Sequence, residues 1–357
     1  STTLIASTVL AVALTIFGLL TSSYLMQMMN TPHNIFDAGD IYLKIYIGGM
    51  VFLFCYNVAT GIFTALGDSK TPLYFLIGSS VGNVALDYLF VAVFHFGVSG
   101  VGWATFLAQG IAGILAVITL LRRVAKLPTG HGKVMLYSKS MLRRIAKIAV
   151  PSILQQSFVS VGNIFIQSLV NSFGSAVIAG YSAAIKLNTF TITSFSTLGN
   201  ALSSFSAQNI GAAKIDRVRK GFRAGTMLAW IIAVPFFVLF FFFGNEMLRI
   251  FMENPTGGAM KAGMAFLKIV SPFYFIISLK LLADGLLRGS SAMIGFMVST
   301  FTDLILRVIL AYVFAGLFGS TGIWMSWPVG WSISAIISLL FYRYTWKQLS
   351  VERRLLK

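Results

Sequence analysis

The sequence predicts an all-α, polytopic membrane protein built as two pseudo-symmetric helical lobes. Hydrophobic residues make up 57% of the 357 residues and charged residues only 10%, whereas a soluble domain has roughly 25% charged residues. The mean hydropathy is +0.84. Apolar runs long enough to cross a bilayer recur along the chain, and one half of the chain repeats the other.

Ten apolar segments reach the length that a transmembrane helix needs. We expect helices at 2–25, 41–66, 72–94, 100–123, 146–171, 176–207, 220–243, 260–287, 292–316 and 322–344. Four prolines fall inside these segments, where each removes a backbone hydrogen bond and bends the helix: Pro151, Pro235, Pro272 and Pro328. We expect bends at these positions and no chemistry.

A repeat with an offset of 224 residues relates the two halves. The matching stretches are MMN at 28–30 with MEN at 252–254, YLKI at 42–45 with FLKI at 266–269, and VALDYLF at 84–90 with VILAYVF at 308–314. Beyond this the offset becomes 222, so that Gly100 corresponds to Gly322. One period holds six helices, an even number, so the halves share one orientation about an axis along the membrane normal.

The repeat divides the chain into an N-terminal lobe of four helices at 1–124, a crossover linker at 125–141, a C-terminal lobe of six helices at 142–345 and a basic tail at 346–357. In the second half, two helices precede the segment that matches Ser1, which itself opens on an apolar run. We therefore expect a fragment of a twelve-helix protein that lacks the first two helices.

The net charge of +17 does not indicate a nucleic-acid binder, because such a protein gathers its basic residues on one solvated face. Here they lie between predicted spans, mainly at 122–147, at 214–223 and from 343 onward. If the helices alternate in direction, these segments share one side, which the positive-inside rule makes cytoplasmic. We expect a multi-pass protein of the plasma (bacterial inner) membrane, with the crossover linker and the C-terminus in the cytoplasm.

The sequence shows no reaction centre. It contains no P-loop, HExxH motif or nucleophile elbow. His33, His95 and His131 lie in predicted loops without clustered acidic or cysteine partners, so no metal site is expected from them. Cys55 is the only cysteine, which excludes an intrachain disulfide.

Asp87 is the ionisable residue that the repeat singles out, because its counterpart is Ala311. A charged carboxylate inside a span costs roughly 2.5 to 3.5 kcal/mol. Desolvation favours the neutral form, which allows such a group to exchange a proton between two access states. Asn83 lies one turn earlier on the same helix face. These features favour a role for Asp87 in ion coupling. The alternative is a structural role, in which Asp87 only hydrogen-bonds a neighbouring helix.

The second half carries its own intramembrane charges. Lys280, Asp284 and Arg288 are spaced i, i+4, i+8, and Asp303 and Arg307 are spaced i, i+4. These acid–base pairs are typical both of a static ion-pair network and of a role in gating or cation attraction. The fifth and sixth spans are also polar, which predicts that they line a cavity; their polar residues include Gln155, Gln156, Lys186 and Asn188.

Several motifs together resemble the multidrug and toxic compound extrusion (MATE) family, in its bacterial, DinF-like branch. They are YNVATGIFTALGDSKTP at 56–72, NVALDYL at 83–89, GVGWATFLAQ at 100–109, AVPSIL at 149–154 and FSAQNIGA at 205–212. The resemblance covers essentially the whole chain, from the family's third helix to its twelfth. It implies two six-helix lobes and a secondary antiporter that exports lipophilic organic cations or drugs in exchange for H⁺ or Na⁺ by alternating access.

The resemblance also implies an ion-coupling site. One branch of the family uses an Asn-x-x-x-Asp helix, a threonine on the following helix and a first-helix aspartate; this chain matches with Asn83, Asp87 and Thr105 and has no counterpart of the last. The seventh-helix glutamate of the other branch aligns with Val159. The coupling ion implied is H⁺ or Na⁺, with no other metal or cofactor. The partners implied are small organic cations and the lipid bilayer, with no nucleic acid, and the protein is expected to be a monomer.

Two other functions remain open from the sequence. A flippase for lipid-linked sugars shares the two-lobe plan and needs several cationic cavity residues, and Lys186, Lys280 and Arg307 leave that reading open. A membrane enzyme such as an acyltransferase needs a histidine or paired carboxylates near one membrane face, and the loop histidines lack such partners.

Overall fold

The computed structural model describes residues 2–28, 33–126, 137–252 and 256–355. Every regular element in these residues is helical, which confirms the predicted all-α class. The chain forms two compact units, unit 1 at Ser1–Ala146 and unit 2 at Lys147–Lys357, and each is described by itself. Most of the predicted crossover linker lies outside the described residues, and the predicted tail continues the last helix as far as Leu355.

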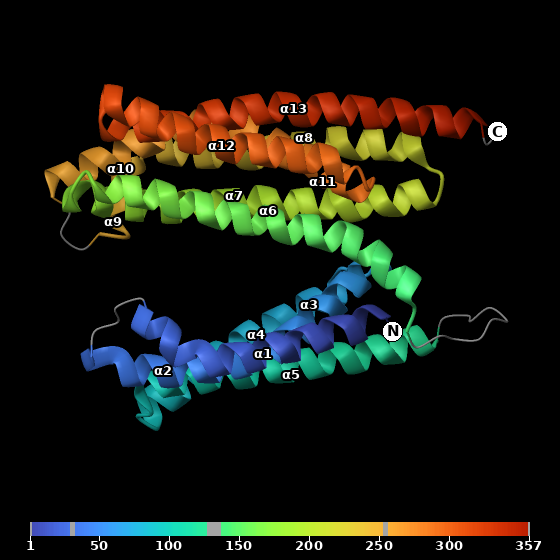
Figure 1. Ribbon diagram of the computed structural model, residues 1–357, viewed down its shortest axis with the longest axis horizontal. Helices are drawn as coiled ribbons and strands as arrows, with labels where there is room; N and C mark the ends of the chain where they lie inside the picture. The colour runs from blue at the N-terminus through green and yellow to red at the C-terminus, as the bar shows by residue number, and fades with distance from the viewer. Residues whose placement is uncertain (1, 29–32, 127–136, 253–255, 356–357) are drawn as a thin grey trace. The chain divides into compact units, whose positions relative to one another are not determined.

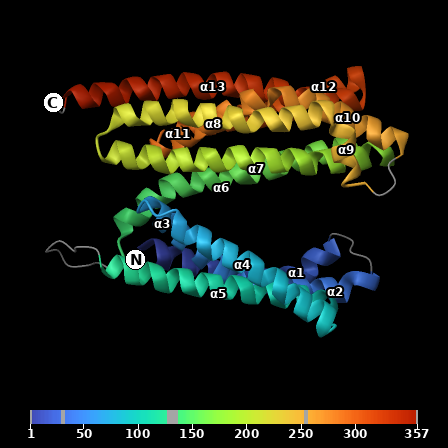
Figure 2. The same cartoon turned by 180° about the vertical axis from the view of Figure 1, so that it is seen from behind.

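Unit 1 is built around one small-residue helix. Its elements are α1 (Thr2–Met28), α2 (His33–Gly48), α3 (Met50–Ala65), α4 (Lys70–Tyr88), the π-helix η1 (Leu89–Val93) and α5 (Gly97–Ala125) (Figure 1). Helix α5 packs against α2, α3 and α4, and Figure 2 shows α3, α4 and α5 from behind. Glycines and alanines such as Gly102, Ala104, Ala108 and Gly113 are buried on α5, which lets its neighbours approach closely.

Unit 2 contains most of α6 (Lys139–Asn171), followed by α7 (Ser175–Gly211), α8 (Ile215–Phe242), α9 (Gly244–Arg249), α10 (Gly257–Val270), the 3-10 turn η2 (Ser271–Phe273), α11 (Tyr274–Gly289), α12 (Met293–Phe318) and α13 (Ser320–Leu355). Helices α12 and α13 are neighbours, and α7 packs on α10 and α11. The core is aromatic: Tyr181 stacks on Trp324 with ring centroids 5.1 Å apart, and Phe266 meets the edge of Trp324.

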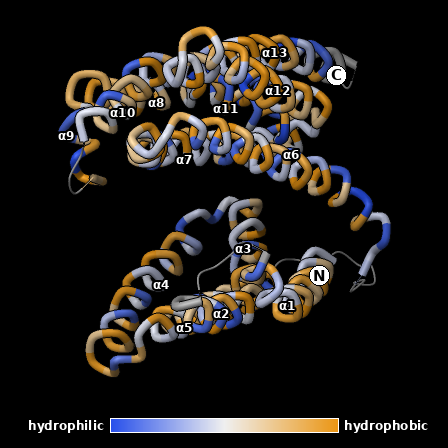
Figure 3. The backbone as a smooth tube through the Cα atoms, turned by 60° about the vertical axis from the view of Figure 1, so that its left-hand side comes forward, coloured by the Kyte–Doolittle hydropathy of each residue, from blue (hydrophilic) through white to orange (hydrophobic). Residues whose placement is uncertain are grey.

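The outer surface of both units suits lipid. Apolar side chains are widely exposed, for example Leu20 at 81%, Val84 at 68% and Ile294 at 77%, and hydrophobic residues predominate along the long helices (Figure 3). Nine helical segments among the described residues are long and apolar enough to cross a membrane. The predicted span at 176–207 is helical as part of α7 but is not one of the nine, because polar residues such as Lys186 and Asn188 interrupt its apolar run.

The helix boundaries follow the sequence repeat. Helix α3 at 50–65 and helix α11 at 274–289 have the same length and are separated by the same 224 residues at both ends. A break precedes each of them, at Gly49 and at Ser271–Phe273. The predicted spans at 41–66 and 260–287 are each present as one membrane span, Phe36–Ala65 and Gly257–Gly289, and each contains one of these breaks. Pro272 explains the second break, because it has no N–H to donate to the preceding turn.

Asp68 joins the start of α4 to the end of α5. Its carboxylate accepts hydrogen bonds from the Thr71 backbone N–H at 3.1 Å and from the Thr71 hydroxyl at 2.8 Å, and Arg123 Nη1 lies 3.8 Å from Oδ2. The hydrogen bonds from Thr71, followed by the Arg123 charge, hold the pKa of this carboxyl below its usual value. The GDSKTP part of the motif at 56–72 therefore has a local structural role.

Helices α7 and α11 touch through backbone atoms. A Cβ built on Gly285 would overlap the carbonyl group of Gly199, and one built on Gly289 would overlap that of Ser203. This is the spacing of small residues, four apart, that allows membrane helices to pack closely. The contact fixes α11, which carries several buried charges, against α7.

Gly285→Ala should lower the thermal stability of the protein. The added methyl group meets backbone that cannot move away as a side chain does, and overpacking costs about 1 to 3 kcal/mol, whereas alanine gains at most about 1 kcal/mol in helix propensity. The matched control is Gly61→Ala at the equivalent repeat position, where a Cβ has nothing within 4 Å. Melting followed by size exclusion in detergent checks this, and equal melting temperatures for the two variants would contradict it.

Candidate functional site

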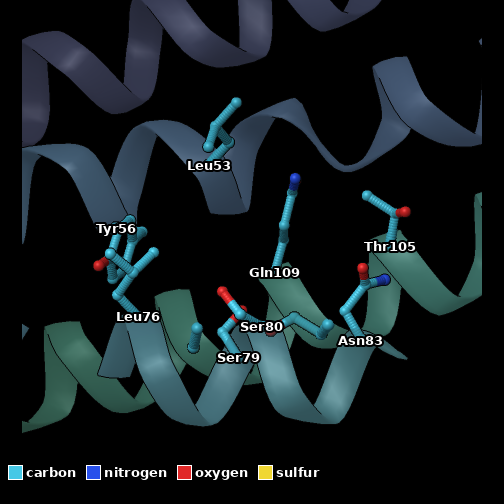
Figure 4. A pocket seen from close by; sticks show the side chains of 10 residues that line it. Leu53, Tyr56, Leu76, Ser79, Ser80, Asn83, Thr105 and Gln109 are labelled. Atoms are coloured by element: carbon cyan, nitrogen blue, oxygen red, sulfur yellow. Dashed lines mark hydrogen bonds between the residues drawn. The ribbon is translucent and has the colours of Figure 1, made fainter. Parts of the chain in front are cut away.

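Unit 1 contains a cavity of about 220 Å³ between α3, α4 and α5. Asn83 from α4 and Thr105 from α5, both predicted ion-site residues, line it (Figure 4). The other lining residues are Leu53, Tyr56, Leu76, Ser79, Ser80, Ala108, Gln109 and Ala112. The fold thus brings two of the three predicted residues to one cavity, and Gln109 adds an amide that the sequence analysis did not single out.

Asp87 lies one helical turn beyond Asn83 on α4 and is not among the residues that line this cavity. Its Oδ1 atom is buried and has no hydrogen-bond partner among the described residues, and the same is true of Asn83 Nδ2. Leaving a buried polar atom unsatisfied costs about 1 to 3 kcal/mol. A buried carboxylate oxygen one helical turn from an amide side chain, without a hydrogen-bond donor among the described residues, can hold a proton or a small cation.

The hydrogen-bond pattern of the helix changes directly after Asp87. Residues Leu89–Val93 form a π-helix, in which Phe94 N donates to the Leu89 carbonyl at 2.9 Å. Such segments are rare and are frequent at functional sites. The sequence LFVAV gave no signal for it, because these apolar residues suit an ordinary helix equally well.

Unit 2 contains a larger cavity of about 470 Å³, lined by residues of α6, α7, α11, α12 and α13. Six of the eight second-lobe residues named from the sequence line it: Gln155, Gln156, Asn188, Lys280, Asp303 and Arg307. Asn163 and Gln167 join them, with Trp327 and Trp331 from α13. The cavity lining from the predicted fifth and sixth spans includes Gln155, Gln156, Asn163, Gln167 and Asn188, as expected for a polar stripe that faces a cavity.

The other two residues do not line the cavity. Lys186 is exposed, and its Nζ lies 5.7 Å from the centroid of the Phe251 ring. It comes two residues before Asn188, and such a separation puts the two side chains about 200° apart around a helix. Asp284 is buried and accepts a hydrogen bond of 2.5 Å from Ser338 Oγ.

A buried lysine links two of the helices. Lys280 Nζ lies 3.0 Å from Asp284 Oδ2 on its own helix and 3.9 Å from Asp303 Oδ2 on α12. Lys280 and Asp284 are only 3% and 2% exposed. Two neighbouring carboxylates offset the cost of burying one ammonium group, so the predicted Lys280–Asp284 pairing is present.

Two predicted pairings are absent from the part of the chain that the structure describes. Arg288 does not pair with Asp284; its Nη2 donates to Asn200 Oδ1 at 2.8 Å, and its guanidinium lies 5.2 Å from the Phe296 ring centroid. Arg307 makes no ion pair with Asp303, because Asp303 turns toward Lys280 and the Arg307 guanidinium lies over Trp327, with Cζ 4.5 Å from the ring centroid. The spacing of four residues along one helix allowed both ion pairs. In the structure, each of these side chains instead contacts groups on other helices.

The two cavities occupy equivalent positions of the repeat. At an offset of 224 residues, Tyr56, Ser79 and Asn83 of the first cavity correspond to Lys280, Asp303 and Arg307 of the second. At the later offset of 222, Thr105 and Gln109 correspond to Trp327 and Trp331. The same places in the two halves therefore carry neutral side chains in unit 1 and charged or large aromatic ones in unit 2.

Across residues 2–28, 33–126, 137–252 and 256–355, His, Cys, Asp and Glu form no group of three or more that could hold a metal ion. His131 and the side chain of His33 lie outside the described residues. The polar groups that line the two cavities are amides, hydroxyls and charged side chains, which can bind and orient ligands.

A family model, MatE, matches residues 1–89 and 151–313, more than half of the chain. The chain belongs to the MatE family. Members of the MatE family are transporters, so this multi-pass membrane protein is a transporter and not an enzyme.

Relatives and solved structures agree with membership of MatE. Two Bacillus subtilis proteins are similar over most of the chain. "Probable multidrug resistance protein YpnP" is 30% identical, with 94% of this chain and 74% of that protein covered. "Probable multidrug resistance protein YoeA" is 28% identical, with 99% and 78% covered. An outward-facing multidrug resistance MATE family transporter of the MOP superfamily has a TM-score of 0.89 at 20% identity, covering 98% of this chain and 78% of that one, so the MatE fold is shared.

Proposed function

We propose that this MatE protein is a multidrug efflux antiporter that exports lipophilic organic cations in exchange for inward H⁺ or Na⁺. The observation that carries the proposal is the group in unit 1: Asn83 and Thr105 line one cavity, and the buried, unpartnered Oδ1 of Asp87 lies one helical turn away from Asn83. The names of the two Bacillus relatives, each a probable multidrug resistance protein, support efflux of drugs.

Asp87 is the coupling residue in this proposal. Its carboxylate takes up a proton or Na⁺ in one access state and releases it in the other, and its occupancy biases the equilibrium between the two states. Asn83 offers its amide oxygen to Na⁺ or its N–H to the carboxylate, and the Thr105 hydroxyl supplies a further oxygen. Alternating access then comes from one lobe moving against the other.

We also propose that the protein acts as a monomer in the plasma membrane, which in a bacterium is the inner membrane, with the crossover linker and the C-terminus in the cytoplasm. The nine apolar spans among the described residues support membrane insertion, and the basic segments at 122–147, 214–223 and 343 onward support this orientation.

The alternative function, a flippase for lipid-linked sugars, is less favoured. A pyrophosphate needs several cations that converge on it. Lys186 lies away from the second cavity, and Lys280 is already held by Asp284 and Asp303. Only Arg307 is left for this task among the three candidate cations.

The test is a flux measurement on purified protein in liposomes. Proton and sodium gradients are imposed one at a time, and the transport of ethidium, a lipophilic cation, is followed by fluorescence. We expect one of the two gradients to drive ethidium against its concentration difference and its collapse to stop the flux, with protein-free liposomes as the control. Ethidium flux that responds to neither gradient, together with flipping of a fluorescent lipid-linked sugar, would instead identify a flippase.

A further inference from the structure

The cavity of unit 2 holds a buried guanidinium group without an acidic partner. Arg307 is 7% exposed and lines the cavity. Within the described residues its guanidinium makes no ion pair and no hydrogen bond, and its Nε is buried without a partner. The contact with Trp327 attracts the positive charge, but it leaves the N–H groups without an acceptor.

Arg307 is the charged residue lining this cavity that makes no ion pair within the described residues. Lys280, Asp303 and Arg307 line the cavity, and the buried Asp284 lies 3.0 Å from Lys280, so the cluster holds two charges of each sign. Lys280 is held between Asp284 and Asp303, and Asp303 turns Oδ2 toward Lys280. A charged side chain among membrane-spanning helices that makes no ion pair is costly and marks a functional site by default. Both carboxylates lie on Lys280, so the Arg307 guanidinium, which lines the cavity, is free to bind an acidic group of a ligand.

The rest of the lining suits a small organic molecule. Five amide side chains line the cavity, from Gln155, Gln156, Asn163, Gln167 and Asn188, and Trp327 and Trp331 add aromatic faces. The volume of about 470 Å³ falls in the range of roughly 300 to 1,000 Å³ that is usual for ligand pockets. A guanidinium group binds carboxylate, sulfonate or phosphate oxygens through two parallel hydrogen bonds.

We propose that the cavity of unit 2 binds a small aromatic organic anion, with the Arg307 guanidinium on its acidic group and Trp327 and Trp331 beside its ring. Arg307 stands at the repeat position of Asn83, so the two halves of the chain recognise groups of opposite charge at equivalent places. This binding site lies in the other unit from Asp87 and does not depend on which ion drives export.

The first test needs no variant. Binding of three probes of one size, naphthalene-1-sulfonate, the neutral naphthalene-1-sulfonamide and the cationic 1-naphthylmethylammonium, is measured by calorimetry on the full chain in detergent. We expect the sulfonate to bind at least about tenfold more tightly than the other two, because a hydrogen bond to a charged group contributes roughly 1.5 to 3 kcal/mol. Equal affinities, or tighter binding of the ammonium probe to Asp303, whose Oδ1 is unpartnered, would overturn the proposal.

The second test places the site. Arg307→Gln should weaken sulfonate binding at least about tenfold, and Arg307→Lys, which keeps the charge but loses the two-pronged geometry, should weaken it several-fold. The matched control is Arg288→Gln: Arg288 also lies over an aromatic ring in unit 2 but does not line the cavity. Where Arg307→Gln does not fold, Arg307→Lys decides. Unchanged binding in the Arg307 variants, or an equal loss in Arg288→Gln, would refute the assignment.

Discussion

Asp87→Asn should reduce gradient-driven ethidium transport to the level of protein-free liposomes and leave membrane insertion unchanged. Asparagine has nearly the same shape as aspartate, and Asp87 Oδ1 has no hydrogen bond to lose within the described residues. The amide, however, neither takes up a proton near neutral pH nor presents a negative charge to Na⁺. The variant should therefore fold normally and lose the coupling of ethidium transport to the ion gradient. The measurement is the ethidium flux assay in liposomes, with the amount of inserted protein as the reference.

Two variants make this result specific. Asp87→Glu retains a carboxyl group and should retain part of the flux. Asp37→Asn removes an exposed carboxylate from the same unit and should transport normally. If Asp87→Asn kept full gradient-driven efflux, Asp87 would be a packing residue and the coupling ion would bind elsewhere.

Lys280→Met should be strongly destabilising. The lysine is buried between Asp284 and Asp303, and removing it leaves two carboxylates without their shared cation. Breaking a buried ion pair from one side costs about 3 to 5 kcal/mol. The expected result is a large drop in the melting temperature of the detergent-solubilised protein. Lys268→Met is the control, because Lys268 is exposed on α10 and its loss leaves no buried acid behind.

The swapped pair Lys280→Asp with Asp284→Lys then separates the two interpretations of these charges. It keeps one charge of each sign on adjacent turns of α11. Recovery of both stability and efflux indicates a static ion pair, and recovery of stability alone indicates that the positions of the charges matter for gating. A Lys280→Met protein as stable as the original would contradict the energetic argument itself.

Much of the fold follows from hydrophobicity alone, since long apolar runs have few structures available in a bilayer. Hydrophobicity alone did not predict where the helices break. Pro272 indicated a bend from the sequence, whereas Gly49 did not stand out, because glycine is common in membrane helices and most positions tolerate it. No feature of the sequence indicated the π-helix after Asp87. A π-helix differs from an α-helix only in which backbone carbonyl accepts the hydrogen bond of each N–H, and the apolar residues here suit both.

The cavity of unit 2 was predictable to the extent that a polar stripe cannot face lipid; Gln155, Gln156 and Asn188 lie where that argument put them. The argument did not fix the rotation of each helix, and Lys186 was misplaced for that reason. Spacing also could not determine partners. Arg307 had Asp303 one turn away, and it lies instead over Trp327, which comes from a helix that no local pattern connects to it.

The matching positions of the two cavities bear on how such a protein diversifies. A duplicated half supplies the same backbone twice, so one copy keeps an inherited lining while the other accumulates new side chains without any new helix having to form. Exchanging a few residues between the copies is then enough to alter what each pocket accepts.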